Sequence, residues 1–283
     1  MEASILIAVR LGLYVSLGLL AGMPLYNCLV ARDSTPIARS LIFTLSVAGI
    51  VLSGLWLLAT AAAMGGTPLS APDWPTLGLV LSSTGMGWAL MLRVAVLVLV
   101  ILLPPRPMLL ALPASMAMAT LAWSGHAAAS EGLWGNVHMA SDILHMLAAA
   151  VWLAALLRFL RGVMRHGASR SITLALSEFA WAGTIIVAVL IVTGLYNLTM
   201  IAGLDLLLKP PLSPYGQLLA AKLMLFAAML GLAAANRWLF TPAMRSGART
   251  GVNGIRISLT VESAFLLAIL SLVAIMGTLD PQP

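Results

Sequence analysis

Residues 125–153 hold three of the chain's four histidines in an otherwise apolar stretch, GHAAASEGLWGNVHMASDILHMLAAAVWL. His138, Asp142 and His145 follow one another there at intervals of four and three residues. On a helix of 3.6 residues per turn, these intervals place the three side chains within an arc of roughly 60°. A neutral imidazole offers a lone pair to a transition metal, and a nearby carboxylate can bind the metal or orient the ring. The spacing therefore predicts a metal site on one helix face.

Further ligands are available close by in the sequence. His126 precedes the stripe and can supply a ligand from the neighbouring helix, while Met139 and Met146 flank it with soft thioether sulfur. Copper accepts both imidazole and thioether ligands, so a copper ion fits this mixture. A structural alternative exists for each residue type. A histidine in a membrane helix can serve only as an interhelical hydrogen-bonding group, and most of the 16 methionines are expected to be packing residues.

The composition is that of an integral membrane protein. The chain is 61% hydrophobic and 8% charged, with a mean hydropathy of +1.04, far from the balance of a soluble domain. Its basic residues lie in short loops between apolar runs, which indicates membrane topology and not nucleic-acid binding. The single cysteine excludes an internal disulfide framework and a CxxC metal site.

Eight apolar runs approach the roughly 20 residues that a helix needs to cross a bilayer. They lie near 4–30, 38–63, 84–103, 107–124, 136–160, 173–201, 215–240 and 256–278. No linker divides them, so we predict an all-α, polytopic membrane protein: a bundle of eight transmembrane helices forming one domain over residues 1–283.

The distribution of arginine predicts the orientation of this bundle. The connections after the first, third, fifth and seventh spans carry arginines, whereas the opposite connections carry only Lys209. By the positive-inside rule the arginine-rich connections are cytoplasmic, so both termini and the start of the histidine stripe are predicted to be periplasmic.

Six ionisable residues remain inside the predicted spans: Arg10, Arg93, Asp142, Glu178, Lys222 and Glu262. Charged groups at that depth are costly, so they face the bundle interior, pair with one another or line a pathway. Three cations match three anions, which makes structural ion pairs the alternative to a functional role. Glu178 and Glu262 can form a lower station for a cation or proton, or partner Arg93.

Several short motifs resemble the CopD (PcoD) family of bacterial copper-resistance membrane proteins, most clearly across residues 125–278. Beside the stripe itself they are GHA at 125–127, HMLAAAVWLAAL at 145–156, TGLY at 193–196, YGQLLAAKL at 215–223, AAANR at 233–237 and VESAF at 261–265. The resemblance implies an eight-span inner-membrane protein that works with a periplasmic copper-binding partner of the CopC type and moves copper inward. It also implies a copper-handling cluster and accompanying charged positions, which would be His126, His138, Asp142 and His145, with Lys222, Glu178 and Glu262.

The leading hypothesis is therefore a copper-handling inner-membrane protein that moves copper ions from periplasm to cytoplasm through a His/Asp-lined site. Two alternatives stay open: a membrane haem or redox protein, with a haem between His126 and His138 or His145, and a delivery factor that passes on copper without transporting it. Enzyme chemistry is not expected, because the sequence has no convincing pairing of a nucleophile with a base.

Overall fold

The computed structural model describes residues 2–125, 132–167, 169–203, 213–246 and 249–280, and within these ranges the regular elements are all helical. The first half contains α1 (Glu2–Tyr26), the π-helical η1 (Asn27–Ala31), α2 (Arg39–Gly65), α3 (Trp74–Ser83), α4 (Gly85–Leu102), α5 (Pro107–Ala119) and the 3-10 helix η2 (Thr120–Ser124). The second half contains α6 (Gly132–His166), α7 (Arg170–Ala202), α9 (Pro214–Ala235), the π-helical η4 (Asn236–Phe240), α10 (Thr241–Arg245) and α11 (Arg249–Met276).

The predicted eight-helix membrane architecture is confirmed. Eight helical segments are long and apolar enough to cross a bilayer: Ser4–Ala31, Arg39–Gly65, Gly85–Leu102, Pro107–Ser124, Gly132–His166, Ser171–Ile201, Pro214–Arg245 and Thr250–Met276. The short helix α3 was not predicted. It has ten residues, too few to cross the bilayer core, and Thr84 separates it from α4 by adopting an extended conformation and capping that helix at Gly87 N (3.0 Å).

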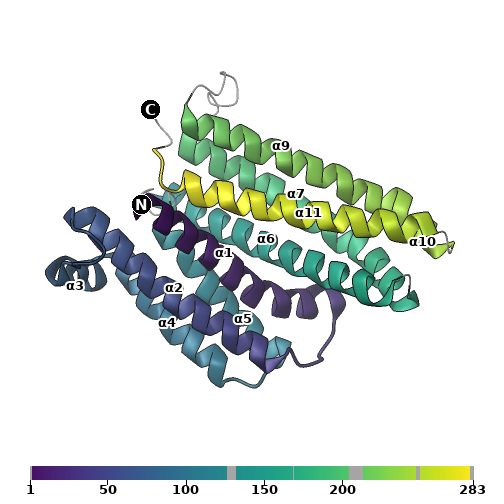
Figure 1. Ribbon diagram of the computed structural model, residues 1–283, viewed down its shortest axis with the longest axis horizontal. Helices are drawn as coiled ribbons and strands as arrows, with labels where there is room; N and C mark the ends of the chain where they lie inside the picture. The colour runs from purple at the N-terminus through teal and green to yellow at the C-terminus, as the bar shows by residue number, and fades with distance from the viewer. Residues whose placement is uncertain (1, 126–131, 168, 204–212, 247–248, 281–283) are drawn as a thin grey trace.

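The helices form two groups joined by α1 and α6 (Figure 1). α1 packs against α2 and α5 on one side and against α6 and α11 on the other, and α6 also packs against α7. Both chain ends lie at one end of the bundle, which we call the termini face. The opposite end carries Arg32, Arg39, Arg106 and Arg161 in or beside its connections and is called the arginine face.

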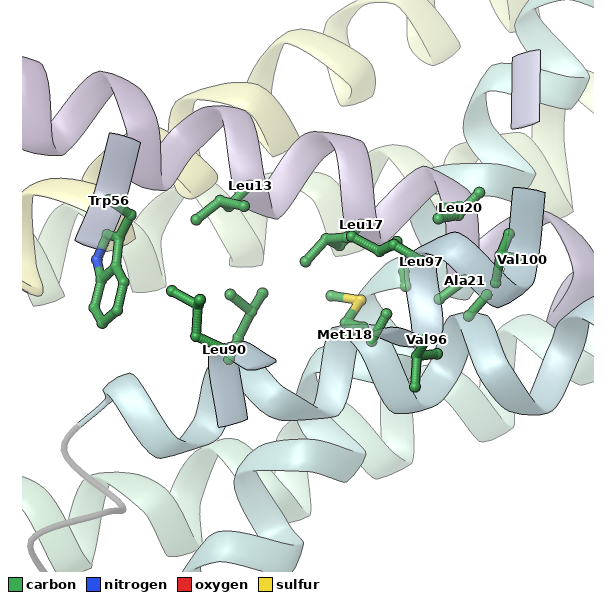
Figure 2. Close-up of a cluster of buried hydrophobic side chains, with 14 of the residues drawn as sticks. Leu13, Leu17, Leu20, Ala21, Trp56, Leu90, Val96, Leu97, Val100 and Met118 are labelled. Atoms are coloured by element: carbon green, nitrogen blue, oxygen red, sulfur yellow. The ribbon is translucent and has the colours of Figure 1, made fainter. Parts of the chain in front are cut away.

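The apolar core beside α1 is built from residues at helical spacing. Leu13, Leu17 and Leu20 lie on one side of α1 and meet Leu97 of α4 and Met118 of α5 (Figure 2). Leu17 and Leu97 are both 0% exposed. Because lipid is as apolar as these side chains, close packing and not exclusion from water holds the helices together.

Glycine permits the closest of these approaches. Gly22 of α1 lies against the backbone of α6, where an added Cβ would overlap the carbonyl oxygen of Ala150 and lie 3.2 Å from Cβ of Ala154. Small residues of this kind let membrane helices approach to backbone contact. Gly22 therefore fixes the distance between the two central helices.

Tryptophans mark both ends of the lipid-facing surface. Trp74 and Trp134 are exposed in the half of the bundle at the termini face, and Trp181 and Trp238 are exposed in the half at the arginine face. Such girdles are typical of the two membrane–water interfaces.

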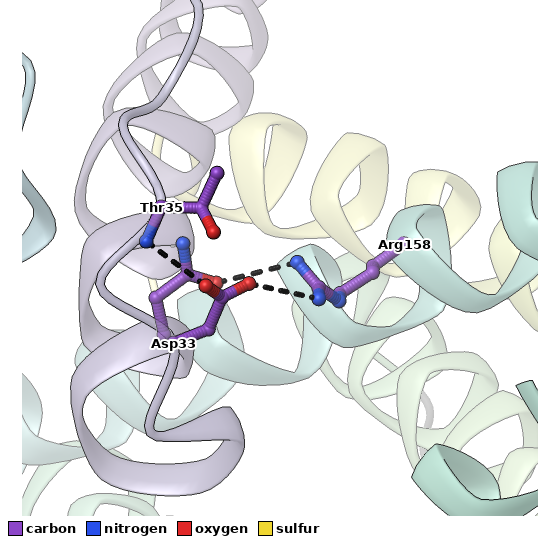
Figure 3. A network of polar contacts seen from close by, with 4 residues as sticks. Asp33, Thr35 and Arg158 are labelled. Atoms are coloured by element: carbon purple, nitrogen blue, oxygen red, sulfur yellow. Dashed lines mark hydrogen bonds and ion pairs between the residues drawn. The ribbon is translucent and has the colours of Figure 1, made fainter. Parts of the chain in front are cut away.

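At the arginine face, Asp33 joins the first two spans to α6 (Figure 3). Its Oδ1 accepts a hydrogen bond from Thr35 N (2.9 Å), and its Oδ2 lies 3.2 Å from Arg158 Nη2. The hydrogen bonds from Thr35, together with the guanidinium of Arg158, lower the pKa of Asp33 below its ordinary value.

This pairing predicts a small acid sensitivity. Because the pKa of Asp33 is lower in the folded state, its stabilising contribution is present above the ordinary carboxyl pKa and lost as the pH falls through the folded value. We expect Asp33→Asn to remove that contribution, at most about 1 kcal/mol because exposed ion pairs contribute little. Thermal unfolding of the purified protein should show a difference between the two proteins that shrinks on acidification. A difference that does not depend on pH would contradict this.

Candidate functional site

The predicted stripe lies on α6, which places its residues on successive turns that descend from the termini face. His138 is buried, and Asp142 and His145 are half-buried. At about 1.5 Å per residue, His145 lies roughly 10 Å deeper than His138. The fourth predicted ligand, His126, lies outside the described residues.

Residues 193–197 of α7 lie against this stripe. Thr193 Oγ1 lies 2.9 Å from His145 Nδ1, and Asn197 Nδ2 donates to Asp142 Oδ1 at 3.4 Å. Tyr196 packs the edge of its ring against His138, with ring centroids 6.4 Å apart. Each residue of the stripe therefore has a contact within the segment 193–197. Sequence reasoning did not assign roles to Thr193, Tyr196 or Asn197, although 193–196 is the TGLY motif of the resemblance.

The contact with Thr193 fixes the tautomer of His145. Thr193 Oγ1 donates its proton to the carbonyl oxygen of Val189, 2.5 Å away on the same helix. It must then accept the hydrogen bond from His145, which places a proton on Nδ1. In a neutral imidazole, this leaves the lone pair on Nε2. Such outer hydrogen bonds are what orient histidines that bind metals.

Gly194 gives the imidazole its space. A Cβ at Gly194 would lie 3.3 Å from His145 Cε1, tighter than ordinary van der Waals contact. The TGLY segment therefore both orients the ring through Thr193 and admits it through Gly194.

Asp142 lies at the centre of a wider polar neighbourhood. Its charge interacts with that of Lys222 on α9, and it also influences Tyr14 on α1. A Cβ at Gly125, the last described residue before the 126–131 connection, would be 3.8 Å from Asp142 Oδ2. Two other helices, α9 and α1, and the chain just after η2 thus contribute to the surroundings of the carboxylate.

A complete metal-binding cluster is not seen. Among the described residues, no group of three or more His, Cys, Asp or Glu side chains is close enough to hold a metal ion. Met146 packs against the apolar core beside α1, and Met139 is half-buried. The described donors are therefore the imidazoles and the carboxylate of α6.

In the described part of the chain, no two of the charged residues inside the spans form a salt bridge within 4.0 Å, although Asp142 and Lys222 act on each other at longer range. The one salt bridge in that part of the chain joins Arg158 to Asp33. Arg93, 1% exposed, instead donates to the hydroxyls of Thr120 (2.7 Å) and Ser53 (3.4 Å). Hydroxyl acceptors thus satisfy a cation that the sequence had matched to a carboxylate.

The surroundings of Arg10, Glu262 and Glu178 also differ from those of direct ion pairs. Nη1 of Arg10 lies where a Cβ of Gly277 would be, directly after the last residue of α11. The carboxylate of Glu262, 2% exposed, accepts from Asn236 Nδ2 (2.5 Å) and Ser258 Oγ (3.1 Å). Glu178 is exposed near the start of α7.

The fold and site together define a polytopic helical membrane protein with a buried polar stripe. Comparison with known proteins specifies the family. Residues 1–136 match the family described as copper resistance protein D-like, N-terminal domain, and residues 173–276 match the family described as copper resistance protein D. The chain belongs to the copper resistance protein D family, which confirms the resemblance to CopD.

Two curated relatives support this assignment. The copper resistance protein D of Pseudomonas syringae pv. tomato is 32% identical over 315 aligned positions, covering 100% of this chain and 98% of the relative. The inner membrane protein YebZ of Escherichia coli (strain K12) is 27% identical over 243 positions, covering 82% and 81%. No solved structure matches. The chain is thus a copper-related, multi-pass inner-membrane protein.

Proposed function

We propose that this protein is a permease that moves copper ions from the periplasm to the cytoplasm, without enzymatic chemistry of its own. Copper enters at the termini face through His126 and His138 and reaches Asp142 and His145. The observation that carries the proposal is the hydrogen bond of His145 to Thr193, because it leaves the Nε2 lone pair of an intramembrane imidazole available to a metal. The family's association with copper resistance supports copper as the ion.

The same proposal assigns the orientation and the partner. The arginine face is cytoplasmic by the positive-inside rule, so the stripe opens to the periplasm. Asp142 supplies a negative charge along the path, and Glu262, farther toward the arginine face, is the next carboxylate that the ion meets. A periplasmic copper-binding protein of the CopC type delivers the ion, because the chain has no long Met/His-rich loop of its own.

Transport by the purified protein tests the proposal directly. Vesicles that contain the wild-type protein are expected to accumulate copper severalfold faster than protein-free vesicles, because the stripe provides ligands inside an otherwise apolar barrier. Copper inside the vesicles is measured after removal of external ion by a chelator. If the protein binds copper but its vesicles accumulate copper no faster than protein-free ones, the protein is a delivery factor and not a transporter. A Soret band after haem supplementation would favour the redox alternative.

The role of Thr193 gives a sharper prediction. Thr193→Val keeps the shape of the side chain but removes the acceptor for Nδ1–H of His145, so the ring loses its fixed orientation. We expect copper affinity to fall by about 10- to 100-fold, the usual cost of losing such an outer hydrogen bond. Equilibrium binding of copper to purified protein checks this. Thr193→Ser is the matched control, because it keeps the hydroxyl, and it should bind nearly as the wild type does; equal loss in both variants would contradict the tautomer argument.

A further inference from the structure

A lysine of α9 lies close to the deepest residue of the stripe. Lys222 lines a cavity of about 290 Å³ between α6, α7, α9 and α11, and the imidazole of His145 lines the same cavity. The rest of the lining is apolar or aromatic. Lys222 is eight residues beyond the start of α9 at Pro214, about 12 Å along the helix, within a hydrocarbon core about 30 Å thick. Its charge therefore acts on the stripe in surroundings that screen it little.

Asp142 and Lys222 interact without forming a salt bridge. Each of the two charges acts on the other, and Lys222 also acts on His145. No carboxylate lies within 4.0 Å of Lys222 in the described part of the chain. The ammonium is thus close enough to act on an ion at the stripe, and its charge balances that of Asp142 before any metal arrives.

The described part of the chain offers no second carboxylate to compensate an arriving ion. The glutamates inside the spans lie elsewhere, one exposed and the other hydrogen-bonded to an amide and a hydroxyl. Tyr14 of α1, on which Asp142 acts, also lies in the field of Arg10 and Arg93. Around the stripe, the positive charges of the described spans therefore outnumber the negative ones.

We propose that Lys222 selects singly charged metal ions at the stripe, which makes Cu⁺ the form of copper that this protein moves. The inference rests on the proposed function and specifies its ion. Asp142 and Lys222 together carry no net charge, so a bound Cu⁺ leaves one positive charge in the group and a divalent ion leaves two. The repulsion between the ammonium and the metal doubles for the divalent ion, and a low-dielectric interior does not compensate it.

Binding of Cu⁺ and of Zn²⁺ to the purified protein in detergent tests this, because both ions have a filled d shell and they differ by one charge. Each affinity is measured by competition with a chelator of known affinity, with a reductant present for Cu⁺. Lys222→Met removes the charge and keeps a long side chain. At a separation of about 10 Å and an effective dielectric constant of about 20, we expect it to raise the affinity for Zn²⁺ about tenfold more than that for Cu⁺.

Lys222→Arg is the matched control, because it keeps the positive charge and should leave the ratio of the two affinities as in the wild type. A measurement on the wild type alone supports the series: excess Zn²⁺ should not displace bound Cu⁺. Displacement of Cu⁺, or an equal change of both affinities in Lys222→Met, would overturn the proposal, while copper uptake by wild-type vesicles would still support transport. A wild-type protein that binds neither ion would overturn both.

Discussion

Replacement of His145 by alanine is expected to abolish copper uptake into vesicles while the protein still folds and inserts. His145 is the deepest residue of the stripe and the one whose Nε2 lone pair is free for a metal. Without it, an ion that reaches Asp142 has no imidazole on the next turn of α6. In an apolar barrier, the loss of one ligand is not compensated by water, so we expect a drop of at least about tenfold, toward the rate of protein-free vesicles.

His166→Ala is the matched control for this experiment. His166 lies at the other end of the same helix, is exposed and does not belong to the stripe. Uptake by this variant should equal that of the wild type, and both variants should elute as the wild type does in size-exclusion chromatography. Unchanged uptake in His145→Ala would exclude the proposed path. Loss in both variants would point to a general effect of the substitutions.

The second large effect concerns the crossing of α1 and α6. Gly22→Ala is expected to lower the stability of the folded bundle by about 1–3 kcal/mol, and Gly22→Leu by more, because the new side chain enters the space of the Ala150 carbonyl. The backbone of α6 at Ala150 cannot rotate away from the new side chain as a flexible side chain could. The two helices must therefore separate. Loss of folded protein on heating in detergent measures the effect.

A glycine with free space provides the comparison. Gly54 of α2 has no atom within 4 Å of the place where a Cβ would lie. Gly54→Ala should be neutral or stabilise by up to about 1 kcal/mol through helix propensity. If Gly22→Ala behaved in the same way, the close approach of α1 and α6 would not matter for stability.

The sequence predicted the spans well because one physical requirement dominates them. A helix that crosses the bilayer must be apolar over its whole thickness. Each span can therefore be recognised from its own hydropathy, without knowing which helices pack against it. The helix α3 gave no such signal, since it does not cross the membrane. Its separation from α4 depends on the backbone conformation at Thr84, which hydropathy does not report.

The site was predictable only where one helix carries it. His138, Asp142 and His145 share a face of α6, so their spacing was sufficient to group them. Their partners on α7 depend on how two helices meet, and a single sequence does not contain that information. The same limit explains Arg93: counting charges favoured a carboxylate partner, whereas helix packing placed the hydroxyls of Thr120 and Ser53 beside it.

The position of Arg10 has a consequence for biosynthesis. Its guanidinium lies beside Gly277, at the carboxyl end of α11, where the helix dipole is negative. A cation of α1 therefore has its counterpart at the end of α11, which is synthesised after the other helices that the structure describes. Until α11 has been inserted, lipid or the insertion machinery must tolerate Arg10, and a chain without Gly277 leaves this charge uncompensated in the membrane.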